Sequence, residues 1–407
     1  MSKFQSILWM TCALAVHPLS AEPAPVVTLE SIGFRVRSQN PNLAAARLMI
    51  DEAIGKMRNT GRLENPELQV GPRYNATSTE RALEVAINQK FPVTNRLKLE
   101  KNLSVTEVES ARVEIREVEN QLIGEGRAAM VRVLAARQRK DLLEQQSKLS
   151  TELADFITAA AKRGEASTLD AGQARLEASR LITESRRIAA EERQALGELK
   201  PLIGMKPGEP LHVSGSLPGL SLPDGANSDK RPALEVARLA VIAAEQNAAV
   251  ERTKRYGDIT AGVVVAAERN IDAPNGAENE GLIGIQFSIP LPFWNKNEGN
   301  IEAAEARAER RRKEVLALRR NILLEAEGTR AEMVEWAKLA AEIDQSLLPQ
   351  ATEQSGLAEQ SWRAGQADLI GVFRSREQSL ALAATRLDAL QNFHLARVRY
   401  ETALGNP

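Results

Sequence analysis

The chain has 407 residues, a formal net charge of −1 and an aromatic content of only 4%. The length predicts two or three domains of ordinary size, and the near-neutral charge argues against nucleic acid or another polyanion as a partner. Abundant alanine with few aromatic residues is more typical of long helices with narrow packing seams than of a thick globular core.

The N-terminus has the pattern of a secretory signal peptide, which we predict over residues 1–21. A short basic region, Met1–Lys3, precedes the apolar run Ile7–Val16, and small residues after this run favour cleavage after Ala21. The run is too short to cross a bilayer as a helix. Since no other segment has about 18 consecutive apolar residues, any further contact with a membrane would need a different structure.

The only cysteine, Cys12, lies inside this predicted signal. The residues before it lack the small side chain expected next to a lipidated cysteine, so we interpret Cys12 as an apolar position of the signal. A mature chain without cysteine has no disulfide. His212 and His394 are far apart in the sequence, and we therefore expect neither a His/Cys metal site nor a cofactor.

The sequence repeats one plan twice, at a separation of about 200 residues, which indicates a duplicated half-molecule because solenoid repeats are far shorter. Four landmarks recur in the same order in both halves. They are Pro41 with Pro232, Pro92 with Pro290, Gly164 with Gly365, and Leu202–Met205 with Ala403–Asn406.

The first repeat is predicted to span residues 22–202. Its first helix begins at Pro41, since proline suits the first turn of a helix. Two short strands follow, at 66–76 and 81–92. A long helical hairpin, 97–202, completes the repeat.

A proline-rich connector, 203–232, joins the repeats, and its leucines favour a loop packed on helices over a disordered linker. The second repeat, 233–407, has the same order of elements. Its strands are predicted at 258–268 and 281–290, with a polar loop between them. Its helical hairpin is predicted at 297–404.

The predicted strands alternate between apolar and polar residues. In the last strand, Ile283, Ile285 and Phe287 alternate with glycine and polar residues, and this period of two predicts one apolar and one polar face. In a soluble protein the apolar face would pack on a core. In an exported chain it can instead face lipid while the polar face lines water, and strands of about 9–11 residues cross a bilayer when tilted.

The second hairpin begins with a very long predicted helix. Strong helix formers dominate from Asn297 to Ala364, where Pro349 is the only proline. Apolar or small residues recur there in steps of four and three, which is typical of a coiled-coil seam. The seam positions are Leu318, Ile322, Ala326, Thr329, Met333, Trp336, Ala340, Ile343 and Leu347.

An aromatic pair, Phe293 and Trp294, lies between the last strand and this helix. Amphipathic aromatic residues favour the membrane–water interface. The alternative is that both rings pack between the sheet and the helices inside the protein.

Three segments together resemble the outer membrane factor family, the TolC-like channels. They are the strand–proline–helix junction Phe287–Ala306, the NPEL segment Asn65–Leu68, and the glycine turns that lead into Ala367–Gln378. The form IPLPFWNKNEGNI, Ile289–Ile301, is most similar to the heavy-metal efflux branch of cobalt–zinc–cadmium type.

The resemblance implies a mainly α-helical fold with a small β part, assembled as a homotrimer in the outer membrane and extending into the periplasm. Four strands from each chain would form one 12-stranded transmembrane β-barrel, and the long coiled-coil hairpins would form an α-barrel. The implied function is the exit duct of a tripartite, proton-driven efflux system for divalent heavy-metal cations. Its partners would be a periplasmic adaptor protein, an inner-membrane pump of the RND type and outer membrane lipid.

The resemblance also implies that the two helical turns form the periplasmic gate and the adaptor docking site. The candidate residues are Gly164, Asp170 and Gln173 at the first turn and Gly365, Asp368 and Arg374 at the second. Some relatives have acidic residues after the second turn that favour cations. Here Gly371 and Arg374 occupy those positions, so a ring of Arg374 would repel cations unless Asp368 or Asp170 pairs with it.

For each of these candidates there is a purely structural alternative. The glycines can serve only to reverse the chain, and the charged residues can be ordinary solvated positions on a helix surface. No catalytic motif occurs in the sequence, so we do not expect an enzyme.

Three other functions remain open from the sequence. The first is an outer membrane channel for drug efflux or type I protein secretion. The second is a periplasmic adaptor, which has a coiled-coil hairpin but should show one hairpin and not two. The third is an elongated structural coiled-coil protein of the periplasm.

Overall fold

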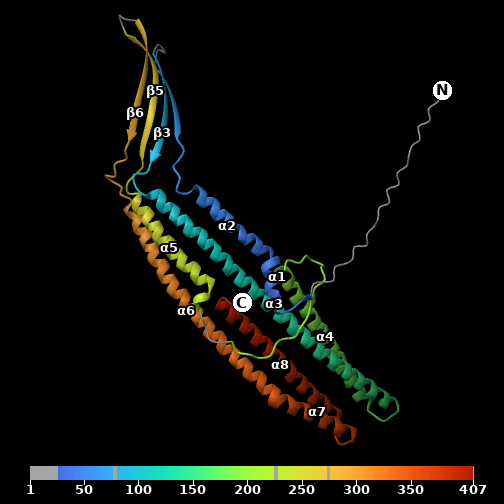
Figure 1. The fold of residues 1–407 in the computed structure, drawn as a ribbon. Coiled ribbons are helices and arrows are strands. Elements are labelled where there is room, and N and C mark those ends of the chain that lie inside the picture. Colours follow the sequence, from blue (N-terminus) through green and yellow to red (C-terminus); the bar gives the residue numbers. More distant parts are fainter. Residues whose placement is uncertain (1–25, 77–79, 224–227, 273–275, 407) are drawn as a thin grey trace, which may run out of the picture.

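The computed structural model describes residues 26–76, 80–223, 228–272 and 276–406. The predicted signal peptide and Cys12 lie outside the described residues. The molecule is elongated, with a small sheet at one end and long helices along the rest of its length (Figure 1). The prediction of a mainly helical fold with a small sheet is confirmed.

Both halves contain a shorter helix, two strands and a long helical hairpin, in that order. The helices of the first half are α1 (Ile32–Gln39), α2 (Pro41–Asn59), α3 (Arg96–Lys162) and α4 (Thr168–Leu202). Those of the second half are α5 (Pro232–Thr253), α6 (Glu298–Glu342), α7 (Leu348–Arg363) and α8 (Leu369–Ala403). In the described part of the chain, none of these helices combines the length and apolar character needed to cross a membrane.

The four longer strands form one antiparallel sheet in the order β2-β3-β5-β6. Their bounds are Glu67–Tyr74 for β2, Arg81–Phe91 for β3, Ile259–Asp272 for β5 and Gly276–Ser288 for β6. The last two strands extend into the segment that the composition predicts as a polar loop. Arg269 pairs with Asn279 and Asp272 with Gly276. Backbone pairing of this kind does not require apolar side chains, which explains why composition places the boundary wrongly.

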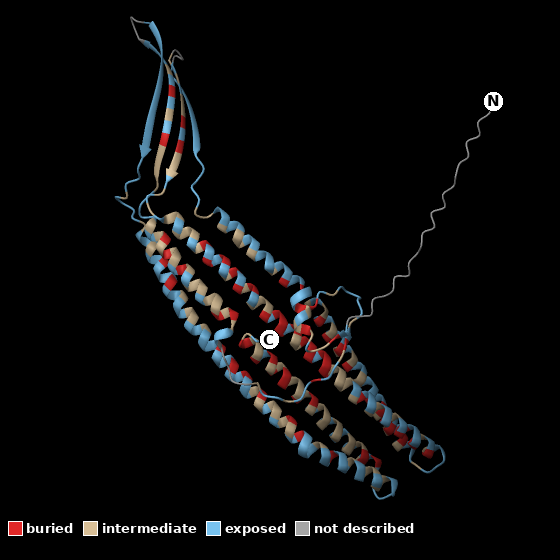
Figure 2. Cartoon of the chain, viewed as in Figure 1, coloured by how far each residue is buried: buried red, intermediate tan, exposed pale blue. Residues whose placement is uncertain are grey.

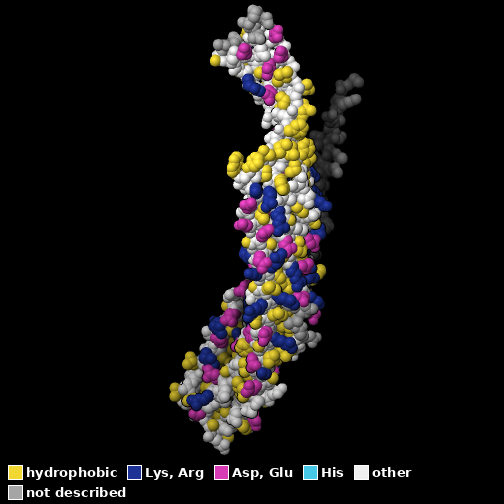
Figure 3. Space-filling model, turned by 90° about the vertical axis from the view of Figure 1, so that its left-hand side faces the viewer, with side chains coloured by type: hydrophobic (Ala, Val, Ile, Leu, Met, Phe, Trp, Pro, Cys, Tyr) yellow, Lys and Arg dark blue, Asp and Glu magenta, His cyan; other side chains and the backbone are white. Residues whose placement is uncertain are grey.

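The two faces of this sheet differ in exposure. Many large apolar side chains are exposed on one face, and Figure 3 shows hydrophobic side chains gathered over the sheet and the junction below it. Ala86, Asn88 and Ala266 on the other face are buried. This asymmetry indicates that the sheet curves around its second face.

Burial along the second hairpin follows the predicted coiled-coil seam as far as a π-helix. Figure 2 shows buried and exposed positions interspersed along the long helices. The seam residues from Ile322 onward are buried or half-buried, except the last, Leu347, which is 36% exposed; Leu348 is half-buried instead. The π-helix Ile343–Leu347 widens the turn by one residue. It ends at Leu347, two residues before Pro349, whose ring would clash with a carbonyl of a regular preceding turn. The seam therefore continues one residue out of phase.

The last helices of the two halves end in the same way. Gly204 follows α4 with φ +69°, and Gly405 follows α8 with φ +77°. In each case the backbone N–H of the residue after the glycine donates to the carbonyl five residues before it. This pattern is typical of helix ends that require glycine. Gly204 lies against the end of α1, and Gly405 lies against the start of α5. A Cβ at Gly204 would overlap the carbonyl oxygen of Gln39, and one at Gly405 would lie 2.9 Å from the Cα of Arg231.

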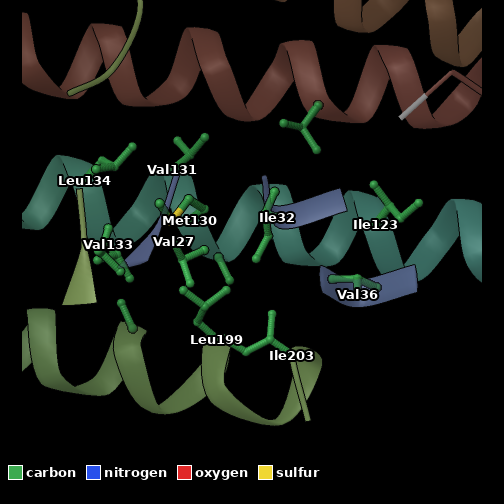
Figure 4. Packing of buried hydrophobic residues seen from close by; sticks show 14 of the residues in the cluster. Val27, Ile32, Val36, Ile123, Met130, Val131, Val133, Leu134, Leu199 and Ile203 are labelled. Atoms are coloured by element: carbon green, nitrogen blue, oxygen red, sulfur yellow. The ribbon is translucent and has the colours of Figure 1, made fainter. Parts of the chain in front are cut away.

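The largest hydrophobic cluster lies halfway along the helices, where α1 and the end of α4 pack on α3 (Figure 4). Neither α1 nor a small parallel sheet beside it follows from the sequence patterns. In that sheet β1 (Val26–Val27) pairs with β4 (His212–Val213) of the connector. Leu217 of the connector is buried in the same cluster, so this leucine packs on helices as predicted.

Candidate functional site: sheet faces, junction and helical tips

One face of the four-stranded sheet is a continuous apolar surface, which we call the outward face. The register places Val70, Val85, Val265 and Ile283 in one row across the four strands. The next row toward the helices contains Leu68, Ile87, Val263 and Ile285. Ile283 and Ile285 are 80% and 73% exposed. A soluble domain rarely leaves such a patch uncovered, so this face requires an apolar partner.

The opposite face, the inward face, carries polar residues that bond to one another. Arg73 forms an ion pair with Glu84 on the adjacent strand, and the Gln286 amide donates to the Asn88 side chain at 2.6 Å. Gly262 lies beneath Asn88, and a Cβ there would overlap the Asn88 oxygen. Glycine at this position is therefore required for the close approach of the polar side chain.

The junction between β6 and α6 turns sharply and is held by polar contacts to α5. Asn297 has φ +60°, which asparagine tolerates better than most residues. Its side-chain amide donates to the Glu251 backbone carbonyl at 2.9 Å and to the Glu251 carboxylate at 3.0 Å. Hydrogen bonds from Lys254 and Asn297 lower the pKa of Glu251, against the effect of burial. The carboxylate therefore stays ionised at the start of the long helix.

The predicted interfacial aromatic residues lie in this junction and are not covered within the chain. Trp294 is 96% exposed and Phe293 is 70% exposed. Their rings contact each other edge to face, with centroids 6.2 Å apart. Their contact with a membrane interface stays a prediction, but packing between sheet and helices within one chain does not occur.

The predicted gate residues lie at the two helical tips, at the end of the molecule farthest from the sheet (Figure 1). Gly164 and Gly365 have φ +75° and +74°, so both positions favour glycine for backbone reasons alone. A Cβ at either position would meet no atom within 4 Å. Because both turns project into open space, their exposed residues are accessible to a partner.

The helix that follows each tip, α4 or α8, begins with a side-chain cap. Ser167 accepts from the Leu169 N–H at 3.1 Å, and Asp368 accepts from the Gly371 N–H at 2.9 Å. Asp368 thus has a structural role that the sequence analysis did not assign to it. The capping pattern, a polar residue just before a helix, was a signal that could have indicated this role.

No ion pair between described residues links the other three gate candidates. Asp170 is half-buried in the first turn of α4, and Arg374 is exposed on α8. Gln173 is half-buried, and its Oε1 atom has no hydrogen-bond partner among the described residues. Among the ion pairs between described residues, none joins Arg374 to Asp368 or Asp170. The charge compensation considered for Arg374 is therefore not provided within one chain.

The two hairpins are joined near their tips by contacts that the sequence analysis missed. Phe156 of α3 contacts Trp362 of α7 edge to face, with centroids 6.3 Å apart. Arg180 of α4 lies 3.4 Å from Glu377 of α8. Leucine, isoleucine and alanine residues of α3, α4 and α8 form a shared cluster beside these contacts. Sequence spacing cannot indicate such pairs, because their partners belong to different repeats.

Glu359 of α7 lies between two arginines near this contact. Arg376 and Arg363 donate to its two carboxylate oxygens, each at 2.6 Å. Burial opposes ionisation of Glu359, but the two hydrogen bonds outweigh burial and hold the pKa of Glu359 below its ordinary value. Glu359 and its two arginines together therefore carry a net positive charge.

No group of three or more His, Cys, Asp or Glu residues in the described part of the chain is arranged to hold a metal ion. His394 is 3% exposed, and its Nε2 atom lies 2.9 Å from the Pro218 carbonyl oxygen of the connector. Burial lowers the pKa of His394. The residue thus fastens the connector to α8.

Asp368→Ala is expected to lower the free energy of unfolding by about 1 kcal/mol, because the start of α8 loses its side-chain cap. Asp368→Asn should retain stability, since asparagine caps a helix equally well. The loss of helical circular dichroism on heating provides the measurement. Ser167→Ala at the equivalent cap of α4 is the matched control and should lose a similar amount. A loss as large in Asp368→Asn as in Asp368→Ala would show that the charge, and not the cap, matters for stability.

Comparison with known proteins gives consistent matches. The model of the family described as outer membrane efflux protein matches residues 227–406, the second half of the chain. The cobalt-zinc-cadmium resistance protein CzcC of Cupriavidus metallidurans is 24% identical over 393 residues, which cover 94% of this chain and 88% of CzcC.

Solved structures of outer membrane channels share the fold over nearly the whole chain. CusC, whose crystal structures were described in relation to transmembrane channel formation, is 18% identical with a TM-score of 0.77, over 93% of this chain and 92% of that one. VceC from Vibrio cholerae is 15% identical with a TM-score of 0.74, over 93% of this chain and 96% of VceC.

Proposed function

We propose that this chain, whose second half matches the outer membrane efflux protein family and whose fold resembles that of CusC over 93% of its length, forms a homotrimeric exit duct. An outer membrane efflux protein is a conduit and not an enzyme. The trimer, the energy source, the partners and the cargo are the parts of this function that we infer.

The outward face carries the proposal. A four-stranded sheet with unpaired edges at β2 and β6 leaves backbone groups unsatisfied. In lipid each such group costs several kcal/mol (roughly 2–7), so a spanning sheet has to be closed. Copies of the chain joined edge to edge would pair β6 of one chain with β2 of the next. Three copies would give 12 strands, with the outward faces toward lipid and the inward faces toward water.

The helices also present apolar surfaces that suit neighbouring copies. Phe34 of α1 and Leu48 of α2 are exposed, and so are Leu316 and Leu324 of α6. Helices α2 and α6 lie on opposite sides of the helical part (Figure 1). Closure of the sheet brings these two sides together in adjacent copies, and their burial there would extend the barrel into a helical tunnel through the periplasm.

The tips are the proposed contacts with the rest of an efflux system. A periplasmic adaptor protein would bind the turns at Gly164 and Gly365, and an inner-membrane, proton-driven pump of the RND type would supply the energy. The similarity to CzcC, a cobalt-zinc-cadmium resistance protein, favours divalent heavy-metal cations as the cargo.

Reconstitution of the purified mature chain tests this function directly. We expect a detergent-dependent trimer that gives stepwise ionic currents in planar bilayers. Deletion of the chain from its host should raise sensitivity to cobalt, zinc or cadmium salts, and plasmid expression should restore resistance. A monomer that stays in solution without detergent would contradict the channel, whereas unchanged metal sensitivity would contradict only the cargo.

Arg374→Asp is expected to shift the selectivity of the reconstituted channel toward cations. In a trimer the substitution replaces three positive charges around one pore level with three negative ones, and rings of charged side chains select ions by sign. The reversal potential in a salt gradient measures the shift, which we expect to be several-fold in the cation-to-anion permeability ratio. Arg186→Asp, an exposed arginine farther along α4, is the control with the same charge change. An unchanged reversal potential in Arg374→Asp would remove Arg374 from the gate.

A further inference from the structure

A row of polar side chains crosses the outward face near the end of the sheet farthest from the helices, and beyond it the β5–β6 pair adds Ile271 opposite Ala277 on this face. Tyr74 is opposite Arg81, Arg81 is opposite Arg269, and Arg269 is opposite Asn279. All four residues are exposed and lie in one row across the four strands. Because side chains alternate with a period of two, this row is on the same face as the apolar rows. We call it the outer polar row.

The centre of the outer polar row contains two like charges on adjacent strands. Residues directly opposite in an antiparallel pair have Cα atoms about 4.5–5.5 Å apart. Like charges in this position destabilise a sheet. Arg81 also makes a contact within the chain. The nearby acidic residues Glu268 and Glu280 are opposite each other on the inward face, so they do not lie between the two guanidinium groups.

The position of the row along the strands matches a lipid headgroup level. Ten residues separate Ile259, at the helical end of β5, from Arg269, which is about 33 Å along a strand at ~3.3 Å for each residue. A strand tilt of about 40° reduces this to a height of about 25 Å, which is the height of the apolar band of outer membrane barrels. Tyr74 in the same row is a residue type that favours this level.

We propose that Arg81 and Arg269 together bind the phosphate group of an anionic lipid headgroup in the outer leaflet. Guanidinium groups bind phosphate oxygens through paired charge-assisted hydrogen bonds, and each carries several N–H donors, so two neighbouring arginines can share one phosphate. The Tyr74 hydroxyl and the Asn279 amide lie beside the pair and offer further donors. This inference rests on the proposed function, because it requires the outward face to contact lipid.

The test measures lipid binding to the purified full-length trimer in neutral detergent. Phosphatidic acid is added at increasing mole fraction, with phosphatidylcholine as the uncharged counterpart, and bound lipid and the melting temperature are recorded. Phosphatidic acid should bind and raise the melting temperature of the wild type. The R81Q/R269Q variant should bind it about tenfold or more weakly, as expected for lost hydrogen bonds to a charged group. Each single variant should lose part of this affinity.

Arg73→Gln is the matched control, because Arg73 belongs to the same sheet but its partner Glu84 places it on the inward face. It should bind phosphatidic acid as the wild type does. Equal binding by the wild type and R81Q/R269Q would overturn the inference, and so would an equal response of the wild type to inorganic phosphate, which would indicate a site for free anions.

Conductance measurements separate this inference from the proposed channel function. R81Q/R269Q should still form conducting channels, because both residues lie outside the inward face. A variant that conducts and keeps its response to phosphatidic acid overturns the lipid site and leaves the channel intact. A wild-type chain that never inserts overturns both.

Discussion

Ile285→Arg is expected to abolish stable insertion of this protein into the outer membrane. Ile285 lies near the middle of the outward face, opposite Val263, and is 73% exposed within one chain. An arginine on the lipid face of a barrel costs about 2–4 kcal/mol at the bilayer midplane, or about 6–12 kcal/mol for three copies. The fraction of protein recovered in the outer membrane after fractionation, and the single-channel current, should both fall more than tenfold.

Gly284→Arg provides the control at the same depth. Gly284 is the preceding residue in β6 and points to the inward face, where a Cβ would meet no atom within 4 Å. An arginine there would face water, so insertion should be retained, although conductance can change. If Ile285→Arg inserted as well as Gly284→Arg, the outward face would not meet lipid, and the alternative of a soluble periplasmic protein would be favoured.

Gly204→Ala is expected to be the most destabilising of four glycine substitutions in the helical part. The left-handed backbone alone costs alanine about 1–2 kcal/mol. At Gly204 the added Cβ also overlaps the backbone oxygen of Gln39, which cannot move without displacing the end of α1, and such overpacking adds about 1–3 kcal/mol. Gly405→Ala should follow closely, because its nearest neighbour is the Cα of Arg231 at 2.9 Å.

Gly164→Ala and Gly365→Ala are the controls, because they measure the cost of the left-handed backbone alone. They have the same left-handed φ as the first two glycines, but their turns leave open space around the added carbon. The melting temperatures of the detergent-solubilised proteins should therefore rank Gly204→Ala lowest, then Gly405→Ala, then the two tip variants. Equal losses at all four positions would mean that close packing of the helix ends adds nothing to stability.

The duplicated plan of the molecule can be predicted from the sequence because its signals are local. Proline at helix starts, glycine after helix ends and a period of two in the strands act within a few residues. The predicted positions of the coiled-coil seam are correct as far as Ile343 for the same reason. It fails at Leu347, since the π-helix before Pro349 shifts the phase of all later positions by one residue.

The candidate site was predictable only in part. The outward face follows from alternation, and the glycines at the tips follow from composition. The cap made by Asp368, the contact of Phe156 with Trp362 and the arginines around Glu359 depend on which helices are neighbours. Such neighbours are distant in the sequence, and the spacing of residues carries no information about them.

The repeat, the longer helices, the four longer strands and the alternation of apolar and polar faces follow from the amino-acid sequence, because each depends on nearby residues. The strand order β2-β3-β5-β6 and the register that aligns Arg81 with Arg269 do not. The close approach of Gly204 to Gln39 does not follow from it either. These features arise from contacts between the two halves or between distant elements, where packing and backbone pairing select one arrangement from many that the local pattern allows.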